Sequence, residues 1–419
     1  MLIFVLFGNM KYLKTFILIL FIATNKTFAG GFQVNLQGIK QTGMANCGVA
    51  LLSDNSLLFF NPGGLALLDT SCSITAGFSP LFPRTLYQEP SSDYASRTIN
   101  HTGTPFNFYT NFRTKKIPKL SLGIGVYTPF GSRVQWPDDW KGQFLLQEIN
   151  LRTIFIQPTI SYRICKKLGI GFGFVYATGS FLLQRALPLQ NQQAQYAQAM
   201  LNGAASGMGY NAGLFFSATD KLSIGINYRS AVVAKVKNGS AEFNVPVAVS
   251  DLFPATNFTT QLSLPSVLSG GISYKFLEKL ILSLDINYVG WNSYDSLIID
   301  FENNTERLSD LRSPRMYKNS YIFRIGAQYK LTKKFDTRAG IYFDQSPVKS
   351  GYLTPETPDS DKIGLTVGCS YKILKNLSAD FALLYIQGKR REDTNVETQF
   401  SGIYKSVALA PTVGISWKF

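Results

Sequence analysis

Residues 279–290 read KLILSLDINYVG, and the fold prediction rests on the pattern of this stretch. Its apolar side chains recur at every second position, at Leu280, Leu282, Leu284, Ile286 and Tyr288. Ser283, Asp285 and Asn287 occupy the positions between them. Successive side chains of a β-strand point to opposite faces, so this stretch is predicted to be a strand with one apolar and one polar face.

The same alternation recurs in residues 168–176, 222–229 and 377–385. In all four stretches the apolar face ends in an aromatic residue, at Tyr288, Tyr176, Tyr228 and Tyr385. After Ser71 the chain has no run of about 20 apolar residues, which a membrane-spanning helix needs. The pattern favours a transmembrane β-barrel with a lipid-facing outside and a polar lumen, although a soluble β-sandwich also alternates.

Short connections decide between these two folds. Six of them carry lysine, at residues 115–118, 165–167, 219–221, 277–279, 332–334 and 374–376. Two strands and one longer polar loop fit between each consecutive pair, which is the arrangement of bacterial outer-membrane barrels. The six turns join twelve strands. A first strand at 71–80 and a last strand ending at Phe419 complete an all-β, 14-stranded antiparallel transmembrane β-barrel, whose longer strands are expected to project beyond the outer surface.

The N-terminus has the features of a secretory signal peptide. Lys11 and Lys14 precede an apolar run at 15–23, and Thr27-Phe28-Ala29 is a small-x-Ala cleavage site. Translation from Met10 would give a signal of more usual length. Residues 1–29 are therefore predicted to be removed from an exported protein, which makes Gly30 the mature N-terminus. A membrane anchor is disfavoured because the lysines interrupt the apolar run.

Residues 30–70 are glycine-rich and irregular, and they precede the predicted barrel of residues 71–419. Fourteen strands enclose a lumen that is too wide for side chains alone to fill. We therefore expect residues 30–70 to form an N-terminal hatch inside the barrel. Its sharpest local signal is Asn61-Pro62-Gly63, because proline after an Asn cap starts a helical turn. This turn is the predicted anchor of the hatch.

The composition limits which ligands and which kinds of function fit this chain. The net charge is +15, but the basic residues are scattered, so nucleic-acid binding is not expected and an anionic small ligand or lipid surface fits better. His101 is the single histidine, and no catalytic triad, P-loop or HExxH motif is present, so we predict no enzyme and no metal or cofactor. Cys47 and Cys72 could form a disulfide bridge or remain free thiols, and the sequence does not decide between the two. The chain ends at Phe419, the kind of terminal residue that barrel assembly machinery recognises.

Several short motifs, in order along the mature chain, resemble the FadL/TodX family of outer-membrane transporters of long-chain fatty acids and other hydrophobic compounds. They are Gly31-Phe32-Gln33, Asn61-Pro62, Tyr127-Thr128-Pro129-Phe130-Gly131, Trp136-Pro137-Asp138-Asp139-Trp140, Gly209-Tyr210-Asn211-Ala212-Gly213, Asn227-Tyr228-Arg229-Ser230, Leu264-Pro265, Asp344-Gln345-Ser346-Pro347-Val348 and Pro358-Asp359-Ser360-Asp361. The resemblance implies a 14-stranded barrel with a hatch, in agreement with the strand count. The chain departs from the family at Gly63, where alanine is more usual.

Two outer loops are candidates for hydrophobic ligand capture. Residues 185–206 are rich in Ala and Gln and uncharged after Arg185, which fits a helix or an ordinary loop equally well. Their apolar candidates are Leu187, Leu189, Tyr196 and Met200. The second loop, 241–260, carries Phe253 and Phe258. The family resemblance points to the same two loops.

The carboxylate of a fatty acid needs a cationic partner, and the candidates are Arg185, Arg315 and Lys318. The alternative is that each of these side chains binds lipopolysaccharide phosphate at the outer rim of the barrel. The resemblance implies an arginine and a lysine in this zone. It also implies that Phe32 reaches into the ligand pocket, whereas the plainer interpretation is that Phe32 fills the core of the hatch.

Pro129, Phe130 and Gly131 interrupt the third predicted strand. Proline cannot donate to the ladder and glycine weakens it, so a bulge or kink is expected. The resemblance implies that this kink opens the wall sideways for ligand release. The leading prediction is passive uptake of long-chain fatty acids across the outer membrane of a Gram-negative bacterium. The alternatives are uptake of aromatic or other uncharged hydrocarbons, and a surface barrel that serves as an adhesin or phage receptor.

Overall fold

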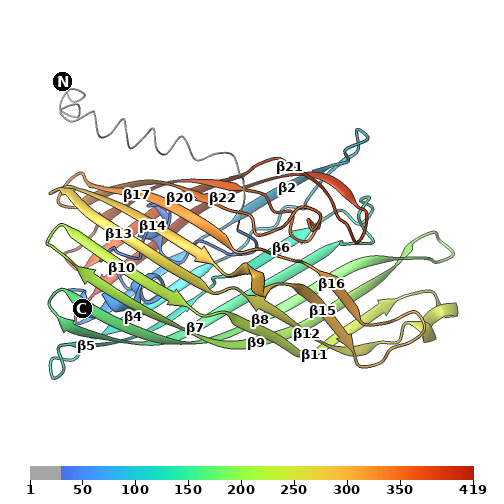
Figure 1. Ribbon diagram of the computed structural model, residues 1–419, viewed down its shortest axis with the longest axis horizontal. Helices are drawn as coiled ribbons and strands as arrows, with labels where there is room; N and C mark the ends of the chain where they lie inside the picture. The colour runs from blue at the N-terminus through green and yellow to red at the C-terminus, as the bar shows by residue number, and fades with distance from the viewer. Residues whose placement is uncertain (1–29) are drawn as a thin grey trace.

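The computed structural model describes residues 30–419, so the predicted signal peptide and the start at Met10 lie outside the described residues. One antiparallel sheet of 22 strand segments curls into a barrel with tilted strands (Figure 1). The barrel closes where β1 pairs with β22, for example at Ala76 opposite Ile415. Because eight barrel strands consist of two segments each, the 22 segments form 14 barrel strands, and the predicted count is confirmed.

In chain order the barrel strands are β1 (Cys72–Phe78) with β2 (Phe82–Gln88), β3 (Ala95–Arg97) with β4 (Phe106–Phe112), β5 (Leu120–Tyr127) with β6 (Gly131–Gln135), β7 (Glu148–Cys165), β8 (Leu168–Gln190), β9 (Tyr196–Ser217), β10 (Leu222–Arg229) with β11 (Val232–Asn244), β12 (Thr256–Leu264) with β13 (Val267–Leu277), β14 (Leu280–Val289) with β15 (Ser296–Phe301), β16 (Leu311–Pro314) with β17 (Ser320–Lys330), β18 (Phe335–Asp344), β19 (Lys362–Lys372), β20 (Leu377–Gly388) with β21 (Arg391–Thr394), and β22 (Ser401–Lys418).

The two faces of the strands differ as the alternation predicts. On β14 the side chains of Leu282, Leu284 and Ile286 are exposed on the outside, whereas Ser283 and Asp285 are buried in the lumen. All six lysine-bearing turns fall between consecutive barrel strands at one end of the barrel. Among the helices of residues 30–419, none is long and apolar enough to cross a membrane.

The helix considered for residues 185–206 is wrong. These residues extend β8 to 23 residues and β9 to 22, and the two strands pair almost without interruption from Leu168–Phe216 to Gln190–Tyr196. Both exceed the roughly 9–11 residues that cross a bilayer, so the hairpin projects beyond it. The ladder gives each backbone group a partner, and this outweighs the helix propensity of Ala and Gln.

The third barrel strand is interrupted where the sequence predicts a kink. Tyr127 of β5 lies opposite Phe155, whereas Gly131 of β6 lies opposite Arg152. Three residues, 128–130, therefore oppose two residues of β7, which is the definition of a β-bulge.

Most of residues 30–68 lies inside the barrel and forms short elements only: α2 (Ile39–Thr42), α3 (Leu57–Phe60) and η2 (Pro62–Leu67) (Figure 1, blue). Lumen-facing side chains of the wall hold the backbone of this segment. Asp285 Oδ2 accepts hydrogen bonds from the amides of Gly48 (2.7 Å) and Val49 (3.0 Å). Arg324 Nη1 donates to the Ala45 carbonyl at 3.0 Å.

The predicted turn at Asn61-Pro62 is present as η2. Asn61 Oδ1 accepts from the Gly63 amide at 3.1 Å, and Asn61 Nδ2 donates to the carbonyls of Val49 (2.7 Å) and Leu214 (3.0 Å). A Cβ at Gly63 would lie 2.7 Å from the carbonyl oxygens of Gly169 and Gly213, so this chain has no room for alanine here. Elsewhere, the short helices η3 (Val247–Leu252) and η4 (Trp291–Ser293) lie in connections, and all four cysteines are free.

Candidate functional site

A cavity of about 50 Å³ lies in the lumen, toward the end of the barrel with the long loops. Its wall consists mainly of inward-facing apolar side chains: Ile149, Leu151, Ala177, Phe181, Ala205, Ala234, Val236, Leu262 and Leu297. The three alanines come from β8, β9 and β11, which are neighbours in the sheet. Small side chains at these positions create the hollow, because bulkier ones would fill it.

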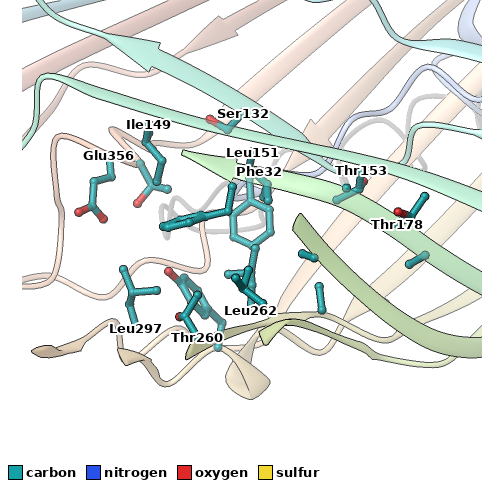
Figure 2. Close-up of a pocket in the computed structure, with 18 residues that line it drawn as sticks. Phe32, Ser132, Ile149, Leu151, Thr153, Thr178, Thr260, Leu262, Leu297 and Glu356 are labelled. Carbon is teal, nitrogen blue, oxygen red and sulfur yellow. The ribbon is translucent and has the colours of Figure 1, made fainter. Parts of the chain in front are cut away.

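Phe32 lies at the centre of the residues that line this cavity (Figure 2). Its ring packs edge-on against Trp291 (centroids 4.8 Å apart), Tyr294 (5.7 Å) and Phe130 (6.2 Å). Gly31 makes this approach feasible, because it adopts φ +59° and a Cβ there would lie 2.6 Å from the Trp291 ring. The N-terminal segment thus contributes an aromatic side chain to the site that the barrel wall encloses.

One edge of the cavity is charged. Glu356 lines it, and Glu356 Oε2 forms a 2.5 Å ion pair with Nη2 of Arg315, whose side chain is only 3% exposed. Arg315 Nη1 also donates to Ser313 Oγ at 2.8 Å. Arg185 is half-buried and attracts Glu356 electrostatically, and within residues 30–419 it forms no ion pair of its own. Neither arginine lines the cavity itself, but together they place two positive charges near the one negative charge of Glu356.

The N-terminal segment also closes the kink from inside. The amide of Val34 donates to the Pro129 carbonyl (2.9 Å), and the amide of Gly131 donates to the Phe32 carbonyl (3.2 Å). Gln33 and Phe130 form the β-bridge between these two bonds. Residues 32–34 therefore pair with the wall at the point where the third barrel strand is interrupted.

A second, more polar cavity of about 30 Å³ lies next to the first. Gln33, Pro129, Phe130, Arg229 and Arg324 are among its lining residues. Phe32 lines the apolar cavity and its neighbour Gln33 lines the polar one, so the N-terminal segment separates the two spaces.

Apolar surface continues outward from the first cavity. Phe258 shares the inward face of β12 with Thr260 and Leu262, which line the cavity. Phe258 belongs to a cluster of aromatic rings. The ring centroid of Phe301 lies 6.5 Å from that of Phe258 and 6.3 Å from that of Phe243, and the centroids of Phe253 and Phe243 lie 5.9 Å apart. This cluster of Phe243, Phe253, Phe258 and Phe301 is called the outer aromatic cluster below.

The remaining predicted ligand residues divide into two groups. Arg185, Leu187 and Leu189 lie on the strand face that Phe181 presents to the cavity. The structure does not bring Met200 and Tyr196 to the cavity. Met200 lies on the face of β9 opposite to Ala205 and is 38% exposed, because the segment is a strand rather than a helix.

Tyr196 is 41% exposed, and its ring packs 4.9 Å from Phe144 instead. Lys318 also lies away from Arg185: its amide donates to the Pro347 carbonyl (2.8 Å), and its ammonium is attracted by Asp361. A lysine on the same loop as Arg315 can point to a different neighbour because the loop is irregular there.

The sequence did not identify Trp291, Tyr294 and Glu356. Trp291 follows Gly290, where the alternation of the ninth barrel strand ends, and this break is the one signal that could have drawn attention to it. Glu356 belongs to the long connection between β18 and β19. No local pattern indicates that it meets Arg315, which is 41 residues away in the chain.

The site contains none of the usual catalytic arrangements. Within residues 30–419 no cluster of three His, Cys, Asp or Glu side chains could hold a metal ion. His101 pairs with an amide, since its Nε2 lies 2.5 Å from Gln135 Oε1.

Known proteins share this architecture. Residues 20–419 match the family model described as outer membrane protein transport protein (OMPP1/FadL/TodX). The long-chain fatty acid transport protein of Escherichia coli K12 is 22% identical over 405 residues, which cover 87% of this chain and 90% of that protein.

Two crystal structures show the same fold. A Pseudomonas aeruginosa FadL homologue superimposes with a TM-score of 0.80 at 18% identity, covering 93% of this chain and all (100%) of the other. The Ralstonia pickettii toluene transporter TbuX gives 0.71 at 19% identity, covering 91% and 98%. The chain therefore belongs to the OMPP1/FadL/TodX family of outer-membrane transport proteins, which are channels of Gram-negative bacteria and not enzymes.

Proposed function

We propose that this protein takes up long-chain fatty acids passively across the outer membrane. The observation that carries the proposal is the apolar cavity around Phe32, whose lining residue Glu356 is paired with Arg315 and is also attracted by Arg185. A fatty acid has the matching chemistry, an apolar tail and a carboxylate. The name of the E. coli relative, a long-chain fatty acid transport protein, supports the same substrate class.

Ligand capture begins at the outer aromatic cluster. Phe243 and Phe253 are half-buried and offer apolar surface between the long loops and the cavity. Phe258 is buried beneath them, on the strand that also contributes Thr260 and Leu262 to the cavity wall. The tail moves along this surface because each methylene removed from water contributes about 0.8 kcal/mol. Lipopolysaccharide surrounds this end of the barrel in the outer membrane, and it is the surface from which the ligand arrives.

The carboxylate binds at the charged edge. Arg185 has no ion pair among the described residues, and Arg315 is held in place by Glu356, so a second carboxylate meets a net positive charge. A charge-assisted hydrogen bond of this kind contributes about 1.5–3 kcal/mol.

The cavity must enlarge to hold the tail. A cavity that binds one benzene molecule has about 150 Å³, and this one has about 50 Å³. The wall strands are fixed by their ladders, whereas Phe32 belongs to the irregular N-terminal segment. Ligand binding therefore displaces Phe32, and with it the backbone of residues 32–34 that closes the kink.

Release is lateral, through the kink, while the rest of residues 30–70 forms the hatch that blocks the axis of the barrel. β4 pairs with β5 only as far as Tyr127, and residues 32–34 supply the next backbone hydrogen bonds. When these two hydrogen bonds break, residues 32–34 no longer pair with the third barrel strand at Pro129 and Phe130, and the wall is open there. The ligand then enters the bilayer without crossing the polar cavity below.

A cavity-filling substitution tests the proposal. Ala205→Phe places a ring in the cavity, whereas Ala204→Phe places the same ring on the outer face of the same strand. In a strain that lacks the natural gene, we expect at least tenfold slower uptake of labelled oleate with Ala205→Phe. Wild-type uptake is expected with Ala204→Phe. Equal uptake by both variants, at equal amounts of folded barrel, would contradict the proposal.

A second candidate substrate class is aromatic hydrocarbons. The rings of Trp291, Tyr294 and Phe130 around Phe32 favour it, because aromatic rings pack well against one another. An uncharged hydrocarbon does not need Arg185. Toluene uptake that depends on Ala205 but not on Arg185, without oleate uptake, would favour this substrate class.

A further inference from the structure

Three buried carboxylates surround the first described residues of the chain. The side chains of Asp344, Asp359 and Asp361 belong to residues that are 3%, 4% and 7% exposed. They lie at the end of β18 and at the start of β19, outside the fatty-acid site proposed above.

The main chain at Gly30 and Gly31 lies directly against this group. The Gly31 amide donates to Asp359 Oδ2 at 3.1 Å. A Cβ at Gly30 would lie 2.5 Å from Asp344 Oδ1 and 2.7 Å from its Cγ, so only glycine fits between the chain and this carboxylate. Asp344 is therefore aimed at the backbone of Gly30.

The neighbouring carboxylate already has its partners. Lys362 Nζ forms an ion pair with Asp359 Oδ1 at 2.7 Å, and the Ser346 hydroxyl donates to Asp359 Oδ2 at 3.0 Å. The Ser346 amide donates to Asp361 Oδ1 at 3.4 Å. In contrast, Asp344 Oδ1 is buried without a hydrogen-bond partner in the part of the chain that the structure describes. A buried carboxylate oxygen without a partner is costly, so this position calls for a donor.

We propose that Asp344, with Asp359 beside it, binds the α-ammonium group that forms at Gly30 when the signal peptide is cleaved after Ala29. An ammonium group offers several N–H donors, and a donor is what the unsatisfied oxygen of Asp344 lacks. Its positive charge would add to the attraction that Lys362 and Arg324 already exert on this carboxylate. Capture of a chain's amino terminus in a dedicated pocket is a known mode of recognition. The proposal rests on the cleavage site and is independent of the compound that is transported.

This contact couples processing to the assembly of the site. Phe32 follows Gly30 by two residues, so a chain end fixed at Asp344 also fixes how far Phe32 reaches into the cavity. An uncleaved or mis-cleaved chain has no ammonium group at Gly30 and cannot form this contact. Correct cleavage is thereby a requirement for placing Phe32.

Selective labelling of amines tests the proposal on the full, membrane-extracted protein. N-terminal sequencing first establishes the mature start. The folded protein is then treated with an amine-reactive ester, and mass spectrometry compares labelling of the α-amine with that of the exposed Lys333 and Lys334. Asp344→Asn removes the proposed partner, and Asp336→Asn, on the same strand far from Gly30, is the control. A third variant inserts one alanine between Ala29 and Gly30 and leaves every barrel residue in place.

We expect the α-amine of the wild type and of Asp336→Asn to react at least tenfold more slowly than the two lysines. In Asp344→Asn and in the insertion variant it is expected to react at least tenfold faster than in the wild type. If Asp344→Asn does not fold, the insertion variant decides. Equal α-amine reactivity in the wild type and the insertion variant, or a mature start other than Gly30, overturns the proposal. Neither result depends on uptake, so a failure here is distinct from a failure of the proposed transport function.

Discussion

Arg185→Met tests the headgroup step most directly. The substitution removes the guanidinium but keeps an unbranched apolar stem on β8. Arg185 forms no ion pair among the described residues, so no buried partner loses its counter-charge and the barrel is expected to fold normally. Replacing Arg315 would be less informative, because Glu356 would lose its 2.5 Å partner.

The expected loss of affinity follows from the charges. With Arg185 the edge has two guanidinium groups against Glu356, and without it Arg315 and Glu356 neutralise each other. One charge-assisted hydrogen bond contributes about 1.5–3 kcal/mol. At about 1.4 kcal/mol for each factor of ten, oleate is expected to bind roughly 10- to 140-fold more weakly.

Calorimetric titration of the purified barrel with oleate and with oleyl alcohol measures this loss. The alcohol has the same tail without the charge, so its Kd is expected to stay within about twofold of the wild-type value. Arg312→Met removes an exposed arginine from the same end of the barrel and serves as the control. An unchanged Kd for oleate, or an equal loss for the alcohol, refutes the headgroup role of Arg185.

Three further changes probe the kink and the N-terminal segment. Deleting Pro129 removes the extra residue of the bulge and is expected to stop oleate uptake with little change in oleate Kd. The control Pro129→Ala keeps the extra residue and is expected to keep most of the uptake. Equal uptake by both variants would argue against lateral release. Asn61→Ala leaves two buried carbonyls without their donor, at about 1–3 kcal/mol each, and is expected to raise ion conductance in planar bilayers; wild-type conductance would show that the turn is no anchor. Burial opposes ionisation of Asp54, but Lys40 and Ser56 outweigh this effect and lower its pKa below the ordinary value of 3.8. The ionised Asp54 therefore stabilises the folded hatch fully above pH 3.8. This stabilisation is lost as the pH falls through the lower, folded-state pKa. Conductance is therefore expected to stay constant from pH 7 to about 4 and to rise only below that, and a rise already at pH 5–6 would assign the transition to another group.

The barrel was predictable because its signals are local and repeated. A strand that faces lipid on one side alternates along its whole length, as in residues 280–289, and each short turn carries its own lysine. The count of fourteen followed from these repeats. Of the breaks within the strands, only the one at Pro129 was predicted. The break after Val289 has no proline to mark it, and Pro80 and Pro265 lie in breaks that were not predicted.

The site was less predictable because it depends on contacts between distant segments. Phe32 and Arg185 were candidates from their place in the chain and the resemblance. Glu356, Trp291 and Tyr294 meet them only in the folded barrel. Met200 was misplaced for a different reason: a local preference for helix in residues 185–206 was overridden by pairing with the neighbouring strands.

The glycines under η2 determine which part of the plug can move. Backbone atoms of Pro62 and Gly63 pack directly on Gly169 and Gly171, and a methyl group at either position would collide with main-chain atoms. At Gly213 a methyl group would collide with Asn61 Oδ1 and the Pro62 ring. Such close backbone packing cannot slide without first separating. In the proposed transport cycle the hatch therefore has a fixed base docked on the glycines, and only the short segment of residues 32–37, between this base and the chain end at Gly30, needs to rearrange.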